Sequence, residues 1–302
     1  MSENPSLPRL YYTDSHALPL PTGHKFPIAK YRMLRDLLER TGFFQFEPAP
    51  LSDLTTIKLS HDPAYVEDFV RGRLSDAAIR RIGFPWSPEL VKRTLASVGA
   101  TLAATDEALK NGWGGTLAGG THHAFYAEGA GFCIFNDIAV AIRKLQAARR
   151  FERFAVIDLD VHQGDGTAQI FQDDPSVLTF SIHCKNNFPL RKQISKFDIA
   201  LDAGVGDDAY LQILLEALPR VWAFKPQIIF YQAGVDVLKS DALGRLALSP
   251  EGLHQRDRVV FESVRKRELP FVITLGGGYS VPIELTARAH ANTFLLAREI
   301  LS

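Results

Sequence analysis

Short apolar segments alternate with longer amphipathic segments along most of the chain. The apolar segments are RLYYT, GTLAGG, RFAVIDLDVH, VLTFSIH, QIIFYQAGVDV and FVITLGGG. Most are almost continuously apolar, as expected for strands that helices cover on both faces. The alternation therefore predicts an α/β fold, in which a parallel sheet lies between two layers of helices.

Amphipathic helices are predicted between these strands. Two of them start at a serine followed by proline, Ser87 and Ser249, which suits a helix cap and first turn. The predicted helices span residues 28–40, 88–110, 136–149, 210–224, 250–266 and 283–301. The chain contains no internal repeat and no linker rich in proline, glycine and serine, so we expect one domain over residues 1–302.

Polar side chains and glycines follow the apolar part of several predicted strands. GTLAGG leads into THHAF, FAVI into DLDVHQGD, IIFYQAG into VDV, and FVITLGGG into YS. Ligands of parallel sheets bind at the carboxyl ends of the strands. We therefore expect these segments to meet at one edge of the sheet and to form the functional site there.

Three side chains at this edge suit a metal ion. The predicted strand runs through DLDVH, so we expect Asp158, Asp160 and His162 to point to the same face, because side chains alternate along a strand. Asp160 and His162 can then share one ion, with Asp236 from another strand as the third ligand. Two carboxylates and one imidazole that leave coordination positions open are typical of catalytic Zn²⁺ or Fe²⁺ sites.

Two adjacent histidines, His122 and His123, follow a pair of glycines. Beside an activated water they could serve as general acid and general base. Each imidazole needs an acceptor that orients its second nitrogen, and Asp158 and Asp165 are the remaining carboxylates, one for each histidine. Tyr279, which follows three glycines, could donate a hydrogen bond to a substrate oxygen.

Composition and charge exclude several other functions. Lys plus Arg and Asp plus Glu are both 34, so the chain has no net charge that would favour nucleic acid or an anionic membrane. The start, MSENPSLPRLYY, lacks the regions of a signal peptide, and no apolar run reaches the roughly 18 residues of a membrane span. Cys133 and Cys184 form no disulfide framework, which fits a cytoplasmic protein.

Six segments together resemble the zinc-dependent histone deacetylase superfamily, which also contains the acetylpolyamine amidohydrolases. They are GGTHHA, GFCIFNDIAVA, DLDVHQGDGT, SIH, QAGVDVL and LGGGYS, in the family's order and across nearly the whole chain. HKFPIAKYRML, GFPWSPELV and SDALGRLALS are most similar to a prokaryotic, class IV-like branch. The resemblance implies the arginase/deacetylase fold, a three-layer α/β/α domain with a central eight-stranded parallel sheet.

The resemblance also implies roles for individual catalytic side chains. Zn²⁺, with Fe²⁺ as an alternative, would be bound by Asp160, His162 and Asp236. The acid–base pair would be His122 and His123, which Asp158 and Asp165 would orient. Tyr279 would polarise the acyl carbonyl and stabilise the oxyanion. Which histidine is the acid and which the base stays open.

Further positions are implied for the substrate and for potassium. A tunnel for the lysine side chain would be lined by Gly131, Phe132, Phe188 and Leu243. One structural K⁺ would bind to groups of Asp158, Asp160, His162, Ser181 and Ile182. A second K⁺ would bind to the carbonyl groups of Phe171, Asp174 and Val177.

These roles imply a hydrolase that removes acetyl or longer acyl groups from N-ε-acyl-lysine in a protein or peptide. An acetylpolyamine or another small acyl-amine is the alternative substrate, and a non-catalytic acyl-lysine binder is a remote alternative. A binuclear arginase-type site would need an acid where this chain has Gly164. The loop RIGFPWS lacks the aspartate with which class I relatives hold the peptide backbone. Acyl length and oligomeric state stay open.

Overall fold

The strands form a single, fully parallel sheet in residues 7–302, the part of the chain that the computed structural model describes. Their order across the sheet is β2-β1-β3-β8-β7-β4-β5-β6. The bounds are β1 Arg9–Tyr12, β2 Gln45–Pro48, β3 Trp113–Thr116, β4 Phe154–Asp158, β5 Val177–Cys184, β6 Phe197–Leu201, β7 Ile228–Gln232 and β8 Phe271–Thr274. The first six residues, part of the stretch expected to lack a signal peptide, lie outside the described residues.

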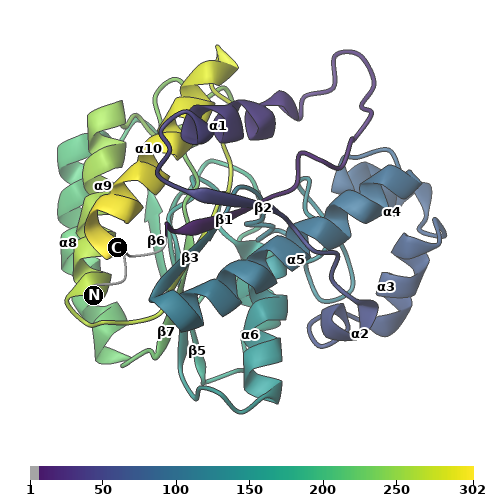
Figure 1. The fold of residues 1–302 in the computed structure, drawn as a ribbon, viewed down its shortest axis with the longest axis horizontal. Helices are drawn as coiled ribbons and strands as arrows, with labels where there is room; N and C mark the ends of the chain where they lie inside the picture. Colours follow the sequence, from purple (N-terminus) through teal and green to yellow (C-terminus); the bar gives the residue numbers. More distant parts are fainter. Residues whose placement is uncertain (1–6) are drawn as a thin grey trace.

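Between residues 7 and 302, six long helices cover the sheet, and four short ones lie in the connections. The long helices are α1 Ala29–Glu39, α5 Pro88–Asn111, α6 Asp137–Ala147, α8 Asp207–Ala223, α9 Pro250–Arg265 and α10 Ile283–Leu301. The short helices are α2 Leu54–Ile57, α3 Pro63–Val70, α4 Asp76–Ile82 and α7 Asp165–Ile170. Figure 1 shows α2, α3 and α4 together beyond α5, on the side of the molecule opposite α8 and α9.

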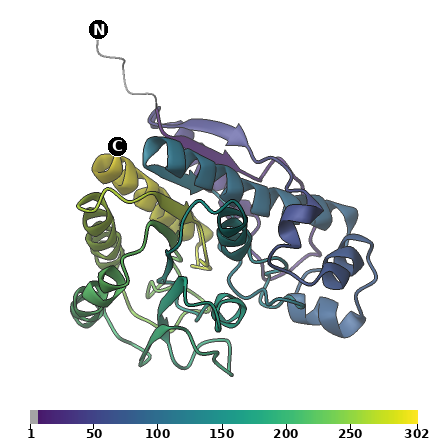
Figure 2. The ribbon, with the colours of Figure 1, turned by 90° about the horizontal axis from the view of Figure 1, so that it is seen from below.

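Alternating side chains place one hydrophobic core on each face of the sheet. In β4, Ala155 and Ile157 pack in the core beneath α1, α8, α9 and α10. Phe154 and Val156 pack in the second core, beneath α5 and α6. Figure 2 shows α8, α9 and α10 on one side of the sheet and α5 on the other. The three-layer α/β/α arrangement with eight parallel strands therefore confirms the predicted fold.

The structure adds elements that the apolar pattern did not predict. Strands β2 and β6 are the two edges of the sheet, and each alternates exposed with more buried residues instead of forming an apolar run. The short helices have too few residues for a clear periodicity, although Asp53, Asp62 and Ser75 cap three of them with side-chain oxygens. Within residues 7–302, every helix falls short of the length and apolarity that crossing a membrane requires.

Four neighbouring strands at the centre of the sheet carry the predicted site. They are β3, β8, β7 and β4, and all four carboxyl ends lie at the same edge because the sheet is parallel. One detail of the prediction is wrong, since β4 ends at Asp158 and does not continue through His162. Asp160 and His162 therefore lie in the loop after the strand, and hydrogen bonds in that loop orient them instead of strand alternation.

Arg256 holds two of these strand ends from beneath. Its guanidinium is fully buried in α9 and donates to the carbonyls of Leu159, 3.0 Å, and Gly234, 2.7 Å, just beyond β4 and β7. The neighbouring Asp257 balances its charge at 2.8 Å and also accepts the hydroxyl of Tyr231. A buried cation thus supports the backbone from which the candidate metal ligands extend.

Replacing this cation is expected to destabilise the fold. In Arg256→Met, Asp257 would stay buried without its cation and two carbonyls would lose their donor, at a cost of about 3–5 kcal/mol in unfolding free energy. Urea unfolding followed by circular dichroism measures the change.

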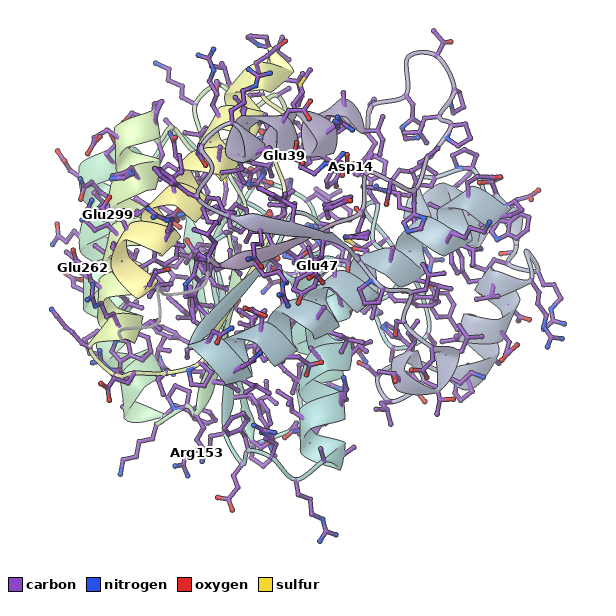
Figure 3. All side chains as sticks on the ribbon, viewed as in Figure 1. Asp14, Glu39, Glu47, Arg153, Glu262 and Glu299 are labelled. Carbon is purple, nitrogen blue, oxygen red and sulfur yellow. The ribbon has the colours of Figure 1, made fainter. Side chains whose placement is uncertain are left out.

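The matched control is Arg258→Met, on the same helix. Arg258 pairs at the surface with Glu262 of the same helix at 3.6 Å and with Glu299 of α10 at 3.3 Å. Figure 3 labels both glutamates. Its loss should cost less than about 1 kcal/mol. An equal loss of unfolding free energy in the two variants would show that Arg256 contributes no more to stability than a surface arginine.

Candidate metal centre and active site

Asp160, His162 and Asp236 come together beyond the ends of β4 and β7. One ligand atom from each residue lies within 4.8 Å of the other two. His162 Nδ1 lies 3.0 Å from Asp160 Oδ1 and 3.1 Å from Asp236 Oδ2. The two carboxylates are 1% and 0% exposed, so both are almost completely removed from solvent. The structure thus brings together the three predicted metal ligands.

Backbone groups orient both carboxylates. Asp236 Oδ1 accepts the N–H of Val161 at 2.9 Å, and Asp160 Oδ2 accepts the N–H of Gly277 at 2.8 Å. Gly277 is required here, because a Cβ atom at this position would overlap the carboxylate of Asp236. Such outer contacts hold metal ligands in position and affect affinity strongly.

Within residues 7–302, only histidines bring positive charge to the cluster: although burial opposes the charged form, hydrogen bonds and charges of Asp160 and Asp236 raise the pKa of His162 to about 10. A histidine that binds a metal must be neutral imidazole, so a bound cation would take the place of this proton. Burial and the neighbouring Asp160 raise the pKa of Asp236 to about 7. No lysine or arginine in residues 7–302 forms an ion pair with Asp160 or Asp236. A divalent cation would offset the cost of burying both carboxylates. The donor set of two oxygens and one nitrogen fits Zn²⁺ and Fe²⁺ alike.

The two histidines are each paired with a different aspartate, as predicted. His122 Nδ1 lies 2.8 Å from Asp158 Oδ2, and His123 Nδ1 lies 2.6 Å from Asp165 Oδ1. Because Nδ1 is engaged in both rings, Nε2 is the nitrogen left to exchange protons with other groups. The ring centroids are 4.1 Å apart, so the two imidazoles border the same space.

Electrostatics distinguish the two histidines. Burial lowers the pKa of His123 to about 4, and the charge of His122 acts in the same direction. Burial also opposes the charged form of His122, but the carboxylates of Asp158 and Asp160 outweigh it and raise its pKa to about 9. The protein groups by themselves therefore favour one charged and one neutral imidazole, which suits paired proton transfer.

A cavity of about 290 Å³ connects these groups. Its walls include the metal cluster, both histidines and Tyr279. All four predicted tunnel residues line it as well, namely Gly131, Phe132, Phe188 and Leu243. Phe188 is 44% and Leu243 is 41% exposed, so these two mark the mouth. One cavity therefore brings the four predicted tunnel positions together with the predicted catalytic side chains.

Phe132 is held in an unusual backbone conformation at the tunnel wall. Its φ of 66° is rare for a non-glycine residue and costs on the order of 1 kcal/mol. The N–H of Phe132 donates to the carbonyl of Ile82 at 2.8 Å, which anchors the segment to the end of α4. The anchored backbone turns the aromatic ring toward the cavity.

Residues 24–295 match the model of the histone deacetylase domain. The chain belongs to the histone deacetylase family. The chain is 44% identical to an uncharacterised protein of Picosynechococcus sp., with 97% of this chain and 99% of that protein covered. It is 30% identical to histone deacetylase 2 of Arabidopsis thaliana, covering 85% and 70% of the two chains. It is also 30% identical to a histone deacetylase-like amidohydrolase of Pseudomonas aeruginosa, covering 88% and 77%.

Membership in the histone deacetylase family makes this chain a hydrolase and confirms the predicted superfamily. Family membership implies acyl-amine substrates, either proteins or small molecules. An arginase-type second metal is disfavoured by geometry, because a side chain at Gly164 would overlap the carboxylate of Asp158.

The predicted potassium ligands of this histone deacetylase family member fall into two groups. Asp158 of β4 and Ser181 of β5 are direct neighbours in the sheet, and Ile182 follows in β5. Phe171 and Asp174 lie in the turn between α7 and β5, where their carbonyls each accept a backbone N–H, and Val177 begins β5. Both K⁺ sites remain predictions.

Sequence reasoning missed two aspartates that hold the site in place. Asp241 Oδ2 accepts the N–H of Tyr279 at 2.6 Å, and Asp241 Oδ1 accepts the N–H of Leu243 at 2.9 Å. Asp137 accepts the N–H groups of Gly120 and Thr121, directly before the two histidines. Asp241 lies in SDALGR, a segment that by its resemblance indicates only the branch of the superfamily. The sequence signal for Asp241 was its place in a loop, because an aspartate often accepts the backbone N–H of the residue two positions later.

Removing one ligand is expected to abolish stable metal binding. Asp236→Ala deletes one of two carboxylates, so bound zinc after dialysis should fall from about one equivalent to well below half, in line with three-ligand sites. Elemental analysis of purified protein measures the content.

Asp173→Ala, at an exposed position outside the cluster, serves as the control and should keep the zinc content of the unmodified protein. Full zinc occupancy in Asp236→Ala would remove Asp236 from the ligand set.

Proposed function

We propose that this chain is a metal-dependent amidohydrolase that removes acyl groups from N-ε-acyl-lysine in proteins or peptides. One observation carries the proposal: a single cavity is lined by the Asp160, His162 and Asp236 cluster, by both histidines and by Tyr279. These are the groups that amide hydrolysis requires, namely a metal site, proton carriers and a donor to the acyl oxygen. Zn²⁺ is the proposed ion, with Fe²⁺ as the alternative.

The shape of the mouth favours a long, thin side chain. The ring of Phe188 meets the ring of His123 edge to face at 4.9 Å, and Phe132 lies on the Tyr279 side with ring centroids 6.4 Å apart. Aromatic walls of this kind suit the four methylenes of lysine, which have no polar atoms to satisfy. The only acids among the lining residues are Asp160 and Asp236. A polyamine would bring additional ammonium groups into a mouth without free carboxylates, which favours acyl-lysine.

The protein groups divide the reaction between them. When bound, the metal ion would activate a water molecule and polarise the acyl carbonyl. One histidine accepts the proton that this water loses, and the Tyr279 hydroxyl donates to the acyl oxygen as negative charge develops there. Burial raises the pKa of Tyr279 well above its usual value. The hydroxyl therefore stays protonated and can donate a hydrogen bond to the acyl oxygen.

Cleavage of the amide bond completes the reaction and gives its two products. The C–N bond of the amide breaks as a histidine passes a proton to the departing nitrogen, which leaves as the lysine amine. The acyl group leaves as a carboxylate with the oxygen of the water. Asp158 and Asp165 stabilise the imidazolium forms and fix Nδ1, so both histidines keep Nε2 toward the substrate.

The proposed function is tested with zinc-loaded protein and matched lysine peptides that carry acetyl, butyryl, octanoyl or myristoyl groups, with acetylputrescine alongside. We expect chelator-sensitive cleavage of the peptides, because every required group lines the cavity. Cleavage of acetylputrescine alone would assign the chain to polyamine metabolism. Binding of the peptides without any cleavage would identify a reader of acyl-lysine.

Tyr279→Phe should lower kcat by about 10²-fold or more while leaving the zinc content unchanged, since one oxyanion donor is lost. Turnover of the best peptide and elemental analysis of the same preparation check both parts. A control is Tyr126→Phe, an exposed tyrosine outside the cavity, which should turn over normally. Normal turnover in Tyr279→Phe would contradict the role of Tyr279.

A further inference from the structure

The inner end of the cavity contains two buried cations that the reaction described above does not use. Lys30 of α1 and Arg93 of α5 both line the cavity and are only 2% and 8% exposed. The mouth residues Phe188 and Leu243 are far more exposed, so the cations lie at the closed end. The acyl group of a substrate bound at the metal cluster would extend toward this end of the cavity.

Neither cation has an acidic partner in the described residues. No carboxylate of residues 7–302 lies within ion-pair distance of Lys30 Nζ or of the Arg93 guanidinium. The hydrogen-bond acceptors of Lys30 Nζ among residues 7–302 are the carbonyls of Gly276 and Gly278, at 3.5 and 3.4 Å, which is the outer limit of hydrogen bonding. Arg93 Nη1 donates to the hydroxyl of Thr13 at 3.3 Å. Most of their donor capacity is therefore unused.

Both cations lie near one aromatic ring. The Arg93 guanidinium lies 4.4 Å from the centre of the Tyr31 ring, and Lys30 Nζ lies 5.3 Å from it. Lys30 Nζ is also 5.4 Å from the centre of the Tyr279 ring, the residue proposed to hold the acyl oxygen. The cations thus flank the space directly behind the reacting carbonyl.

The charge balance of the cavity leaves this end positive. The only lining acids, Asp160 and Asp236, would be neutralised by a divalent cation. Burying two cations without partners is unfavourable, and a carboxylate is the group that offsets this cost, especially against the forked donors of arginine. The hydroxyls of Thr94 and Ser97, which also line this end, add neutral donors.

We propose, on the basis of the function proposed above, that the inner end of the cavity binds a carboxylate at the far end of the acyl group. The preferred acyl groups are then dicarboxylic, such as succinyl or glutaryl on lysine. Two or three methylenes separate the carboxylate from the acyl carbonyl in these groups, a reach of about 4–5 Å with C–C bonds of about 1.5 Å. Hydrolysis releases the lysine amine and a dicarboxylate, with both oxygens of the new carboxylate accounted for by the acyl oxygen and the water.

The test compares two zinc-loaded reactions that differ only in this charge. One lysine peptide carries a glutaryl group, and the other carries 5-methylhexanoyl, its uncharged equivalent in shape. We expect kcat/KM to be at least about tenfold higher for the glutaryl peptide, as charge-assisted hydrogen bonds would provide. In Lys30→Met the ratio of the two values should fall at least about tenfold, and Arg93→Gln should act in the same direction.

Lys30→Met removes a buried, unpaired charge and is expected to fold, and the ratio cancels any change in the amount of active protein. Lys239→Met, at an exposed lysine outside the cavity, is the matched control and should leave the ratio unchanged.

Each other outcome has a distinct meaning. Equal losses for both peptides in Lys30→Met would show that Lys30 only supports the glycine-rich loop, and would overturn the proposal. A ratio near one in the unmodified protein, with acetate inhibition that weakens in Lys30→Met, would assign the cations to the released carboxylate and overturn it too. Cleavage of neither peptide, nor of acetyl-lysine, would instead overturn the proposed function and this inference with it.

Discussion

The burial of like charges at one edge of the sheet is the constraint on which the rest of the site depends. Asp160 and Asp236 are almost fully buried, and Asp158 and Asp165 lie close by beneath the histidines. A protein pays heavily for such a cluster unless each group has a partner. Imidazoles and backbone N–H groups partner these carboxylates, and a bound metal ion would neutralise Asp160 and Asp236. The parallel sheet makes this possible, because it gathers four strand ends, each followed by loop N–H groups that can donate.

The same constraint explains why the loops around the site contain residues of special shape. Gly277 lets the glycine-rich loop approach both metal carboxylates, and Gly164 leaves space for Asp158. Asp137 and Asp241 accept loop N–H groups and thereby keep the histidine segment and Tyr279 in place. Arg256 performs a related task from the opposite side, since it holds the carbonyls behind two strand ends. The positions of the reacting groups are thus set mainly by backbone hydrogen bonds.

Much of this arrangement could be predicted from the sequence, for identifiable reasons. The central strands are continuous apolar runs, and the chemistry follows each of them, so the fold class and the convergence at one edge were predictable. The pairing of His122 with Asp158 and of His123 with Asp165 followed from the count of carboxylates and from the family resemblance. Edge strands β2 and β6 escaped because they are short and partly exposed. The end of β4 was misplaced because an apolar pattern cannot show where hydrogen bonding to neighbouring strands stops. Lys30 and Arg93 could not be found, since their helices join the cavity only in three dimensions.

Asp241 connects the backbone of Tyr279 with the backbone of Leu243 at the mouth of the cavity. One carboxylate oxygen holds the backbone of Tyr279, which lines the cavity beside the catalytic groups, and the other holds Leu243 at the mouth. A rigid connection of this kind makes the two positions energetically linked, and such linkage is reciprocal. On the proposed function, a protein surface that displaced Leu243 on docking would change the affinity for the acyl oxygen, and a bound acyl group would change the affinity for that surface by the same factor. The residues that flank the modified lysine would thus be sensed at the oxyanion donor as well as at the mouth.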